Sequence, residues 1–187
     1  MRISPSRLLE IDVLAYLVLF TAVFLQNPLA DYDYFWHLKT GEILVHNLAL
    51  PAGDIFSFTM HGQPWVLHEW GYQIVLYFVH TLFGDSGIRL FSTALLFGAL
   101  AISFAPARRL GIHPIVILLF LLLYIVPMVP YTQPRPQVIT YICFAYFLKC
   151  LLDYKHYAER KLLYHLPLLM VMWVNFHGGY IIGLALM

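Results

Sequence analysis

The acidic residues of this sequence gather in one segment, together with histidines and tryptophans. Six of the ten acidic residues lie between positions 27 and 86, and Asp31 and Asp33 stand at the start of a helical pattern. His68 and Glu69 stand at the start of a second one. A carboxylate can take the proton of a hydroxyl group, and carboxylates and imidazoles can bind a cation. The segment 27–86 is therefore where we expect the chemistry of this protein.

The first helical pattern covers residues 33–47. One face follows an apolar helical spacing, and a separate polar face carries Asp33, His37 and Thr40. Such a polar face suits a site that is turned to the membrane surface. A carboxylate at the start of a helix can also cap its free N–H groups, so capping and catalysis both stay open for Asp31 and Asp33.

The pair His68–Glu69 invites comparison with the zinc-protease motif His-Glu-x-x-His. The comparison fails because Tyr72 stands where that motif needs its second histidine. The remaining possible ligands are Asp31, Asp33, His37, His68 and Glu69. Oxygen ligands favour Mg2+ or Mn2+, and histidines favour Zn2+. A divalent cation held by Asp33 and Glu69 is one expectation, and a site without a cofactor is the other.

Polar residues also stand near the ends of later apolar segments. Arg135 lies in the turn Pro-Arg-Pro-Gln, and an arginine near lipid needs a phosphate or carboxylate partner. It can also extend to lipid headgroups, so both roles stay open. Asn175 and His177 interrupt the last apolar run, where polar residues mark either a functional site or hydrogen bonding between helices.

The composition sets the class of protein. Of the 187 residues, 61% are hydrophobic and 11% are charged. Such a chain cannot coat a water-soluble domain, whose charged fraction is about a quarter. We expect an all-α, polytopic transmembrane protein. A net charge of +1 offers no basic surface for nucleic acid. Cys143 and Cys150 share one face of an apolar helix and are expected to be packing residues.

Apolar stretches predict the membrane spans. Five spans are expected, over residues 8–25, 88–107, 113–130, 136–152 and 162–187. A further stretch, 69–83, would reach only about 22 Å as a helix, against the ~30 Å hydrocarbon core. We expect it to lie along the outer membrane surface, with Gln73, Tyr77 and His80 on its wetter face.

Basic residues indicate the orientation of these spans. With 69–83 outside the bilayer core, Arg2, Arg108 and Lys161 all fall on one side, which is then the cytoplasm. The N-terminus is expected to be cytoplasmic. Residues 27–86 are expected to form an external loop with two interfacial helices, over 33–47 and 69–83.

The order of these features resembles the GT-C superfamily of membrane glycosyltransferases, which use polyprenyl-phosphate-linked sugars. The likeness lies mostly between Asp31 and Gly111. It consists of a signal anchor, acids that open one interfacial helix, Glu69 at the start of a second helix that ends Leu82-Phe83-Gly84, then Arg89, and the run Arg108-Arg109-Leu110-Gly111.

This resemblance implies transfer of a sugar from a polyprenyl-phosphate carrier to an unknown acceptor, on the outer face of a bacterial cytoplasmic membrane. It implies that Asp33 or Asp31 is catalytic or metal-associated, with Glu69 as the second acid. Arg135 would stabilise the departing phosphate. Other residues expected to contact membrane lipid or substrate are His37, Trp36, Trp65, His68, Asn175 and His177. The two tryptophans could also simply anchor the loop at the interface.

Two features depart from the family. Some members carry an acid where this chain has Arg135, and this chain ends at Met187 inside an apolar segment. We therefore expect the N-terminal part of a larger GT-C core. Two other functions stay open. A transporter or lipid-binding subunit would line a path for an anion with Arg135, Asn175 and His177, and a membrane scaffold would dock a partner on its long loop.

Overall fold

The fold is that of a computed structural model, which describes residues 5–26, 29, 31–128 and 133–187. It is 75% helix and has no strand among these residues, so the prediction of an all-helical fold is confirmed. The elements in chain order are α1 (Pro5–Gln26), α2 (Asp33–Asn47), α3 (Trp70–Arg109), α4 (Pro114–Met128), α5 (Gln137–Tyr157), the 3-10 turn η2 (Arg160–Tyr164), α6 (His165–Phe176) and α7 (Tyr180–Ala185).

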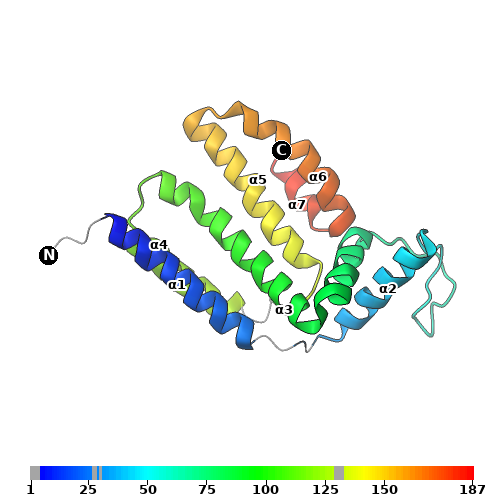
Figure 1. The fold of residues 1–187 in the computed structure, drawn as a ribbon. Coiled ribbons are helices and arrows are strands. Elements are labelled where there is room, and N and C mark those ends of the chain that lie inside the picture. The colour runs from blue at the N-terminus through cyan, green and yellow to red at the C-terminus, as the bar shows by residue number, and fades with distance from the viewer. Residues whose placement is uncertain (1–4, 27–28, 30, 129–132) are drawn as a thin grey trace.

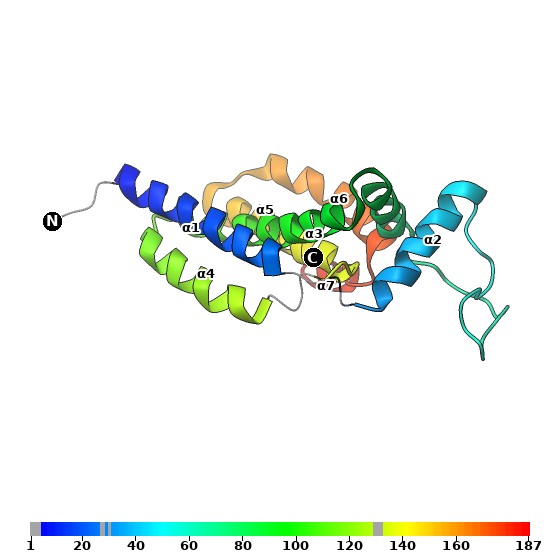
Figure 2. The same cartoon turned by 60° about the horizontal axis from the view of Figure 1, so that its bottom comes forward.

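Most of the helices lie side by side along one direction, and α2 lies at one end of this bundle (Figure 1, Figure 2). Within the bundle α3 packs mainly against α5, and its first part packs against α2. The loop that follows α2 projects beyond this end (Figure 2). The segments that carry the acids and histidines of interest are therefore gathered at one end of the molecule.

Helix α3 is bent at Gly84, whose backbone has φ 61° and ψ −159°. A residue with a Cβ rarely adopts a positive φ, whereas glycine does so readily. The bend separates residues 70–83, which we call the first arm of α3, from residues 85–109, the second arm. It lies close to the boundary expected from the sequence between the segments 69–83 and 88–107. Directly after the bend, Asp85 Oδ1 accepts the hydroxyl hydrogen of Tyr34 over 3.1 Å. This bond ties α2 to the second arm of α3.

Helix α2 has the bounds expected from the sequence, and it packs closely on the first arm of α3. A Cβ at Gly41 would lie 2.1 Å from the carbonyl oxygen of Gln73, so only glycine fits there. The buried face of α2 includes His37 and Thr40, which corrects the expectation that they face the membrane surface. Gln73 is also fully buried, at 0% exposure, and so does not belong to a wetter face of its helix.

The hydrophobic core lies where α3, α5 and α6 meet. Tyr72, Phe147 and Trp173 are fully buried in it. Cys143 and Cys150 are buried in the same cluster and are not bonded to each other. The prediction that the cysteines are packing residues is therefore confirmed.

Among the described residues, α3 is the one helix that is long and apolar enough to cross a membrane. The apolar parts of α1 and α4, Val13–Leu25 and Pro114–Tyr124, are shorter. The expected segment 162–187 is not one helix, because the extended backbone of His177 (φ −165°, ψ 145°) separates α6 from α7. Outside the described residues lie Arg2, positions 27, 28 and 30 of the expected external loop, and positions 129–130 of the expected third span.

A charged cluster lies at the C-terminal end of α5. Arg109 contacts Asp153 over 3.0 Å and Glu159 over 2.6 Å, and Lys149 contacts Asp153 over 2.6 Å. Helix α5 has 21 residues. A helix of that length spans about 30 Å. Asp153 lies 16 residues after Gln137, which is about 24 Å along the helix, so the Arg109 cluster is most of a bilayer core away from the start of α5, just before which Arg135 stands.

Candidate functional site

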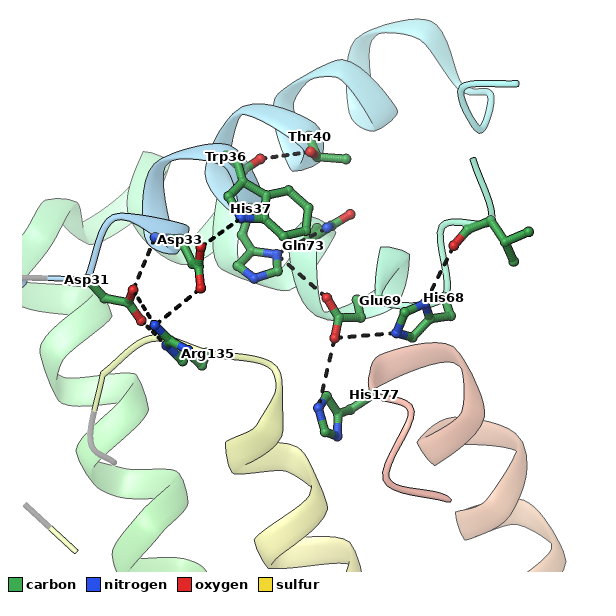
Figure 3. Close-up of polar contacts among 11 residues, drawn as sticks. Asp31, Asp33, Trp36, His37, Thr40, His68, Glu69, Gln73, Arg135 and His177 are labelled. Atoms are coloured by element: carbon green, nitrogen blue, oxygen red, sulfur yellow. Dashed lines mark hydrogen bonds and ion pairs between the residues drawn. The ribbon is translucent and has the colours of Figure 1, made fainter. Parts of the chain in front are cut away.

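Arg135 joins the two aspartates at the start of α2 (Figure 3). Its Nη2 lies 2.8 Å from Asp31 Oδ1 and 3.2 Å from Asp33 Oδ2, and its Nε donates to Asp31 Oδ2. The arginine precedes α5 and is 104 positions from Asp31 in the chain. The two-point contact expected of this arginine is thus made to a carboxylate of the chain itself. Its side chain remains 45% exposed, so part of the guanidinium is open to another anion.

Asp31 also caps α2. Its Oδ1 accepts the backbone N–H of Asp33, the first residue of the helix, over 3.1 Å. A carboxylate at this place satisfies a free N–H group and is stabilised by the positive end of the helix dipole. Asp33 Oδ1 accepts the indole N–H of Trp36 over 3.3 Å, and the Asp33 side chain is 48% exposed. The capping alternative therefore holds for Asp31, while Asp33 is open to solvent.

Three histidines surround the carboxylate of Glu69, which is 15% exposed (Figure 3). His68 Nε2 lies 3.6 Å from Oε1, and His177 Nε2 lies 3.9 Å from the same oxygen. His37 Nδ1 lies 3.9 Å from Oε2. These side chains come from α2, from the start of α3 and from the turn between α6 and α7. The fold thus brings His37 to the pair His68–Glu69, as the candidate ligand set required, and adds His177, which the sequence singles out separately.

The pKa values of the Asp31 and Glu69 carboxyl groups are shifted in opposite directions. Burial by itself raises the pKa of Asp31, but the hydrogen bonds from Arg135 and from the Asp33 N–H outweigh this and hold the pKa below its usual value. Burial raises the pKa of Glu69, against a smaller lowering effect of His68. Asp31 therefore stays ionised beside its partner, and Glu69 is the better proton acceptor near neutral pH.

His37 lies beside Glu69, and the charges of Asp33 and Asp31 also act on it. It is buried, with 3% exposed, and its Nδ1 accepts an amide N–H of Gln73 over 3.2 Å. Burial lowers the pKa of His37 to about 4, against raising effects of Asp33 and Asp31. His37 is therefore neutral at pH 7 and brings no positive charge to an anionic substrate. Gln73 belongs to the site although the sequence pattern does not indicate it.

Asn175 and His177 have different partners. Asn175 Oδ1 accepts the indole N–H of Trp70 over 2.9 Å, and its amide donates to the Val171 carbonyl oxygen over 2.7 Å. These bonds hold the start of α3 against α6, so the helix-to-helix alternative holds for Asn175. His177 Nδ1 lies 2.7 Å from Thr140 Oγ1, and its other ring nitrogen is the one that faces the Glu69 carboxylate. A substrate contact of Asn175 stays a prediction.

An aromatic cluster adjoins the aspartates. The ring centroid of Trp36 lies 6.2 Å from that of Trp65 and 6.5 Å from that of Phe56, and the last two rings are 6.0 Å apart. Phe56, which is 42% exposed, comes from the loop after α2 and was not indicated by the sequence pattern. Because Trp36 also bonds to Asp33, an apolar face lies directly beside a carboxylate.

The ligands expected for a divalent cation are Asp33 and Glu69. Among the residues that the structure describes, no group of three His, Cys, Asp or Glu side chains is arranged to hold a metal ion. Arg135 already binds Asp31 and Asp33, and its positive charge opposes a cation placed between them. Metal binding by Asp33 and Glu69 stays a prediction.

No protein-family model matches this sequence, and no curated protein or solved structure matches it either. The site combines three chemical groups. They are a carboxylate suited to accept a proton, a guanidinium that is partly open to an anion, and an aromatic face. This combination suits a transfer in which a hydroxyl group loses its proton and a phosphate leaves.

Proposed function

We propose that this protein is a membrane glycosyltransferase of the GT-C type, which moves a sugar from a polyprenyl-phosphate carrier to an acceptor on the outer face of the membrane. The observation that carries the proposal is the pairing of Arg135 with Asp31 and Asp33, with His37 between that pairing and Glu69. The order of acids, short helices and apolar segments, which resembles that superfamily, supports the same function.

The reaction divides between two charged groups. Glu69 takes the proton of the acceptor hydroxyl as its oxygen attacks the anomeric carbon of the sugar. The bond from that carbon to the phosphate oxygen breaks, and the polyprenyl phosphate leaves with the electron pair. The exposed part of the Arg135 guanidinium stabilises the charge on this phosphate. Asp31 acts through Arg135, which it holds in place from a buried position.

In this proposal, Asp33 and the aromatic cluster contact the sugar. The half-exposed carboxylate of Asp33 can offset the positive charge that develops on a sugar ring when its glycosidic bond breaks. Trp36, Trp65 and Phe56 present an apolar face beside that carboxylate, and such faces suit the C–H groups of a sugar ring. Their position favours substrate contact over simple anchoring of the loop.

The proposal includes five membrane spans and a cytoplasmic N-terminus. Helix α3 provides one span, and α1, α4, α5 and the run from α6 to α7 would provide the others. The side-by-side arrangement in Figure 1 supports this, as do large exposed apolar side chains such as Leu17, Leu119 and Leu168. With the Arg109 cluster in the cytoplasm, the site at the other end of α5 faces outward.

A divalent cation would have to bind at Glu69 and at the part of Asp33 that Arg135 leaves open. Chelation during the transfer assay, followed by addition of Mg2+, Mn2+ or Zn2+, tests this. Loss and recovery of transfer would assign the cation. Transfer that is unchanged by chelation would remove it from the proposal and leave the roles of Glu69 and Arg135 in place.

The experiment that tests the function uses the intact protein in lipid vesicles, with polyprenyl-phosphate hexoses and pentoses offered one at a time and membrane extract as the source of acceptor. The release of free polyprenyl phosphate is measured. We expect Arg135→Gln to lower the rate about 100-fold, and Arg135→Lys to lower it less, because lysine keeps the charge but loses the two-point geometry. Arg160→Gln, an exposed arginine in η2, is the matched control. A wild-type rate in Arg135→Gln would overturn the proposal.

A further inference from the structure

A chain of hydrogen bonds leads from the core to His177, whose other ring nitrogen faces the Glu69 carboxylate. Trp173 of α6 donates its indole N–H to Thr140 Oγ1 of α5 over 2.9 Å. Thr140 Oγ1 lies 2.7 Å from His177 Nδ1, and His177 Nε2 lies 3.9 Å from Glu69 Oε1. The chain thus crosses from α6 to α5 and ends in the turn before α7, where His177 faces the start of α3.

The donors of this chain fix its direction. The backbone N–H of Gly179 can only donate, and it bonds to His177 Nδ1 over 3.1 Å. Nδ1 must therefore accept, and the neutral imidazole carries its proton on Nε2. The indole N–H of Trp173 can also only donate, so the Thr140 oxygen accepts from it and its own hydrogen is available for Nδ1.

The geometry leaves little freedom in the chain. Thr140 is 8% exposed and Trp173 is fully buried. A Cβ at Gly179 would lie 2.2 Å from Thr140 Oγ1, so the backbone of the turn before α7 packs closely against the hydroxyl group. The Thr140 hydroxyl and the Gly179 N–H thus share the lone pair of His177 Nδ1, and His177 Nε2 faces Glu69 (Figure 3).

We propose that Thr140 and His177 are positioning residues that hold an N–H donor against the carboxylate of Glu69. This inference rests on the proposed role of Glu69 as the proton acceptor. The separation of 3.9 Å is longer than a hydrogen bond, and bonds of this kind often tighten when substrate binds. A donor there favours the ionised carboxylate, which must exist before Glu69 can take a proton from the acceptor.

Two other histidines and the buried Tyr72 also act on or near Glu69, and none of them supplies this donor as well. The Tyr72 hydroxyl has no hydrogen-bond partner among the described residues. His37 Nδ1 accepts from Gln73, so that nitrogen has no proton to offer. The His68 side chain is 55% exposed, so solvent weakens its effect. The charge of Asp33 acts in the opposite sense and favours protonated Glu69. His177 is the neighbour that is both held in one tautomer and shielded.

The test measures the protonation of Glu69 without any sugar substrate. Dicyclohexylcarbodiimide reacts with protonated carboxyl groups, so the labelling of Glu69 in the intact, detergent-purified protein is followed against pH by peptide mass spectrometry. We expect His177→Leu to move the midpoint of labelling upward by about one pH unit, because the carboxylate loses a donor. We expect Thr140→Val to move it in the same direction by about half as much.

Conservative variants separate positioning from a general structural effect. His177→Gln keeps an N–H near the Nε2 position, and Thr140→Ser keeps the hydroxyl, so both are expected to keep the wild-type midpoint. His46→Leu, an exposed histidine at the end of α2, is the matched control. If His177→Leu does not fold, the comparison of Thr140→Val with Thr140→Ser gives the answer. A wild-type midpoint in His177→Leu or Thr140→Val, or equal shifts in the conservative variants, would overturn the inference.

The outcome is distinguishable from failure of the proposed function. Shifted labelling in a protein that transfers no sugar would keep the hydrogen-bonded chain and remove the glycosyltransferase. Sugar transfer that depends on Glu69, with unshifted labelling in His177→Leu, would keep the function and remove the positioning role of His177.

Discussion

Arg135 and Asp31 are 104 positions apart in the chain and form a two-point ion pair at one end of the helix bundle. Asp31 is buried, with 8% exposed, so its charge depends on this partner. Removing Arg135 would leave the buried charge of Asp31 uncompensated, which costs more than the pair itself contributes. The pair therefore both positions the guanidinium and joins the start of α2 to the start of α5.

The two aspartates are predicted to have unequal weight in stability. Asp31→Asn removes the two-point ion pair that joins the start of α2 to Arg135, and is expected to lower the Tm in detergent by about 5 °C. Asp33 is half exposed, so Asp33→Asn is expected to change the Tm by only about 1 °C. Scanning fluorimetry of the two variants checks this. Equal shifts in Tm would contradict our expectation that the buried aspartate contributes more to stability than the half-exposed one.

Glu69 is predicted to reduce stability at neutral and basic pH. Its folded-state pKa is raised, so the folded chain binds the proton more tightly than the unfolded chain, and stability falls as the pH rises through that range. Glu69→Gln removes this loss of stability, because glutamine carries no charge at any pH. We expect the variant to be at least as stable as the wild type at pH 8, and the difference to shrink toward pH 4. A variant that is less stable than the wild type at pH 8 would contradict the raised pKa.

The contact between α2 and α3 is predicted to require glycine at position 41. Replacing a helical glycine by alanine normally stabilises a helix by about 0.5–1 kcal/mol. Gly98→Ala, where the nearest side chain lies at 3.4 Å, is expected to follow that rule. Gly41→Ala is expected to do the opposite and to impair sugar transfer, because its Cβ would collide with the Gln73 carbonyl. Stabilisation by Gly41→Ala would contradict the close packing of α2 on α3.

The orientation in the membrane is predicted from the two ends of α5. Phe58 is 99% exposed in the loop after α2, and His156 is exposed near the Arg109 cluster. Phe58→Cys is expected to react with an impermeant maleimide from outside intact cells, and His156→Cys only after the membrane is opened. The native cysteines are buried and serve as the background control. Labelling of both positions from the same side would contradict the proposed topology.

The sequence predicts the helices better than it predicts the faces that they bury. Apolar spacing gives the bounds of α2, and Gly84 lies where the interfacial segment was expected to end. The same spacing misplaces His37, Thr40 and Gln73. His37 and Gln73 are buried because they bond to each other across two helices, and Thr40 is buried because its hydroxyl donates to the Trp36 carbonyl of its own helix. Periodicity reports the polarity of a side chain and does not report whether a neighbour will bond to it.

The site residues were recognisable by type, but most of their pairings were not. The sequence favours an anion near Arg135, and the fold supplies Asp31 as that anion, from a position that no local pattern connects to it. The roles of Thr140 and Phe56 depend on contacts across the fold, with His177 and with Trp65, so no spacing in the sequence indicates them.

The central claim is that the carboxylate of Glu69 accepts a proton during sugar transfer. The most direct measurement is the single-turnover rate of sugar transfer in Glu69→Gln against Glu42→Gln, an equal change at an exposed glutamate of α2 that pairs with Lys39. We predict that Glu69→Gln lowers the rate by about 10²–10⁴-fold and that Glu42→Gln leaves it unchanged. Equal rates in the two variants would contradict the account.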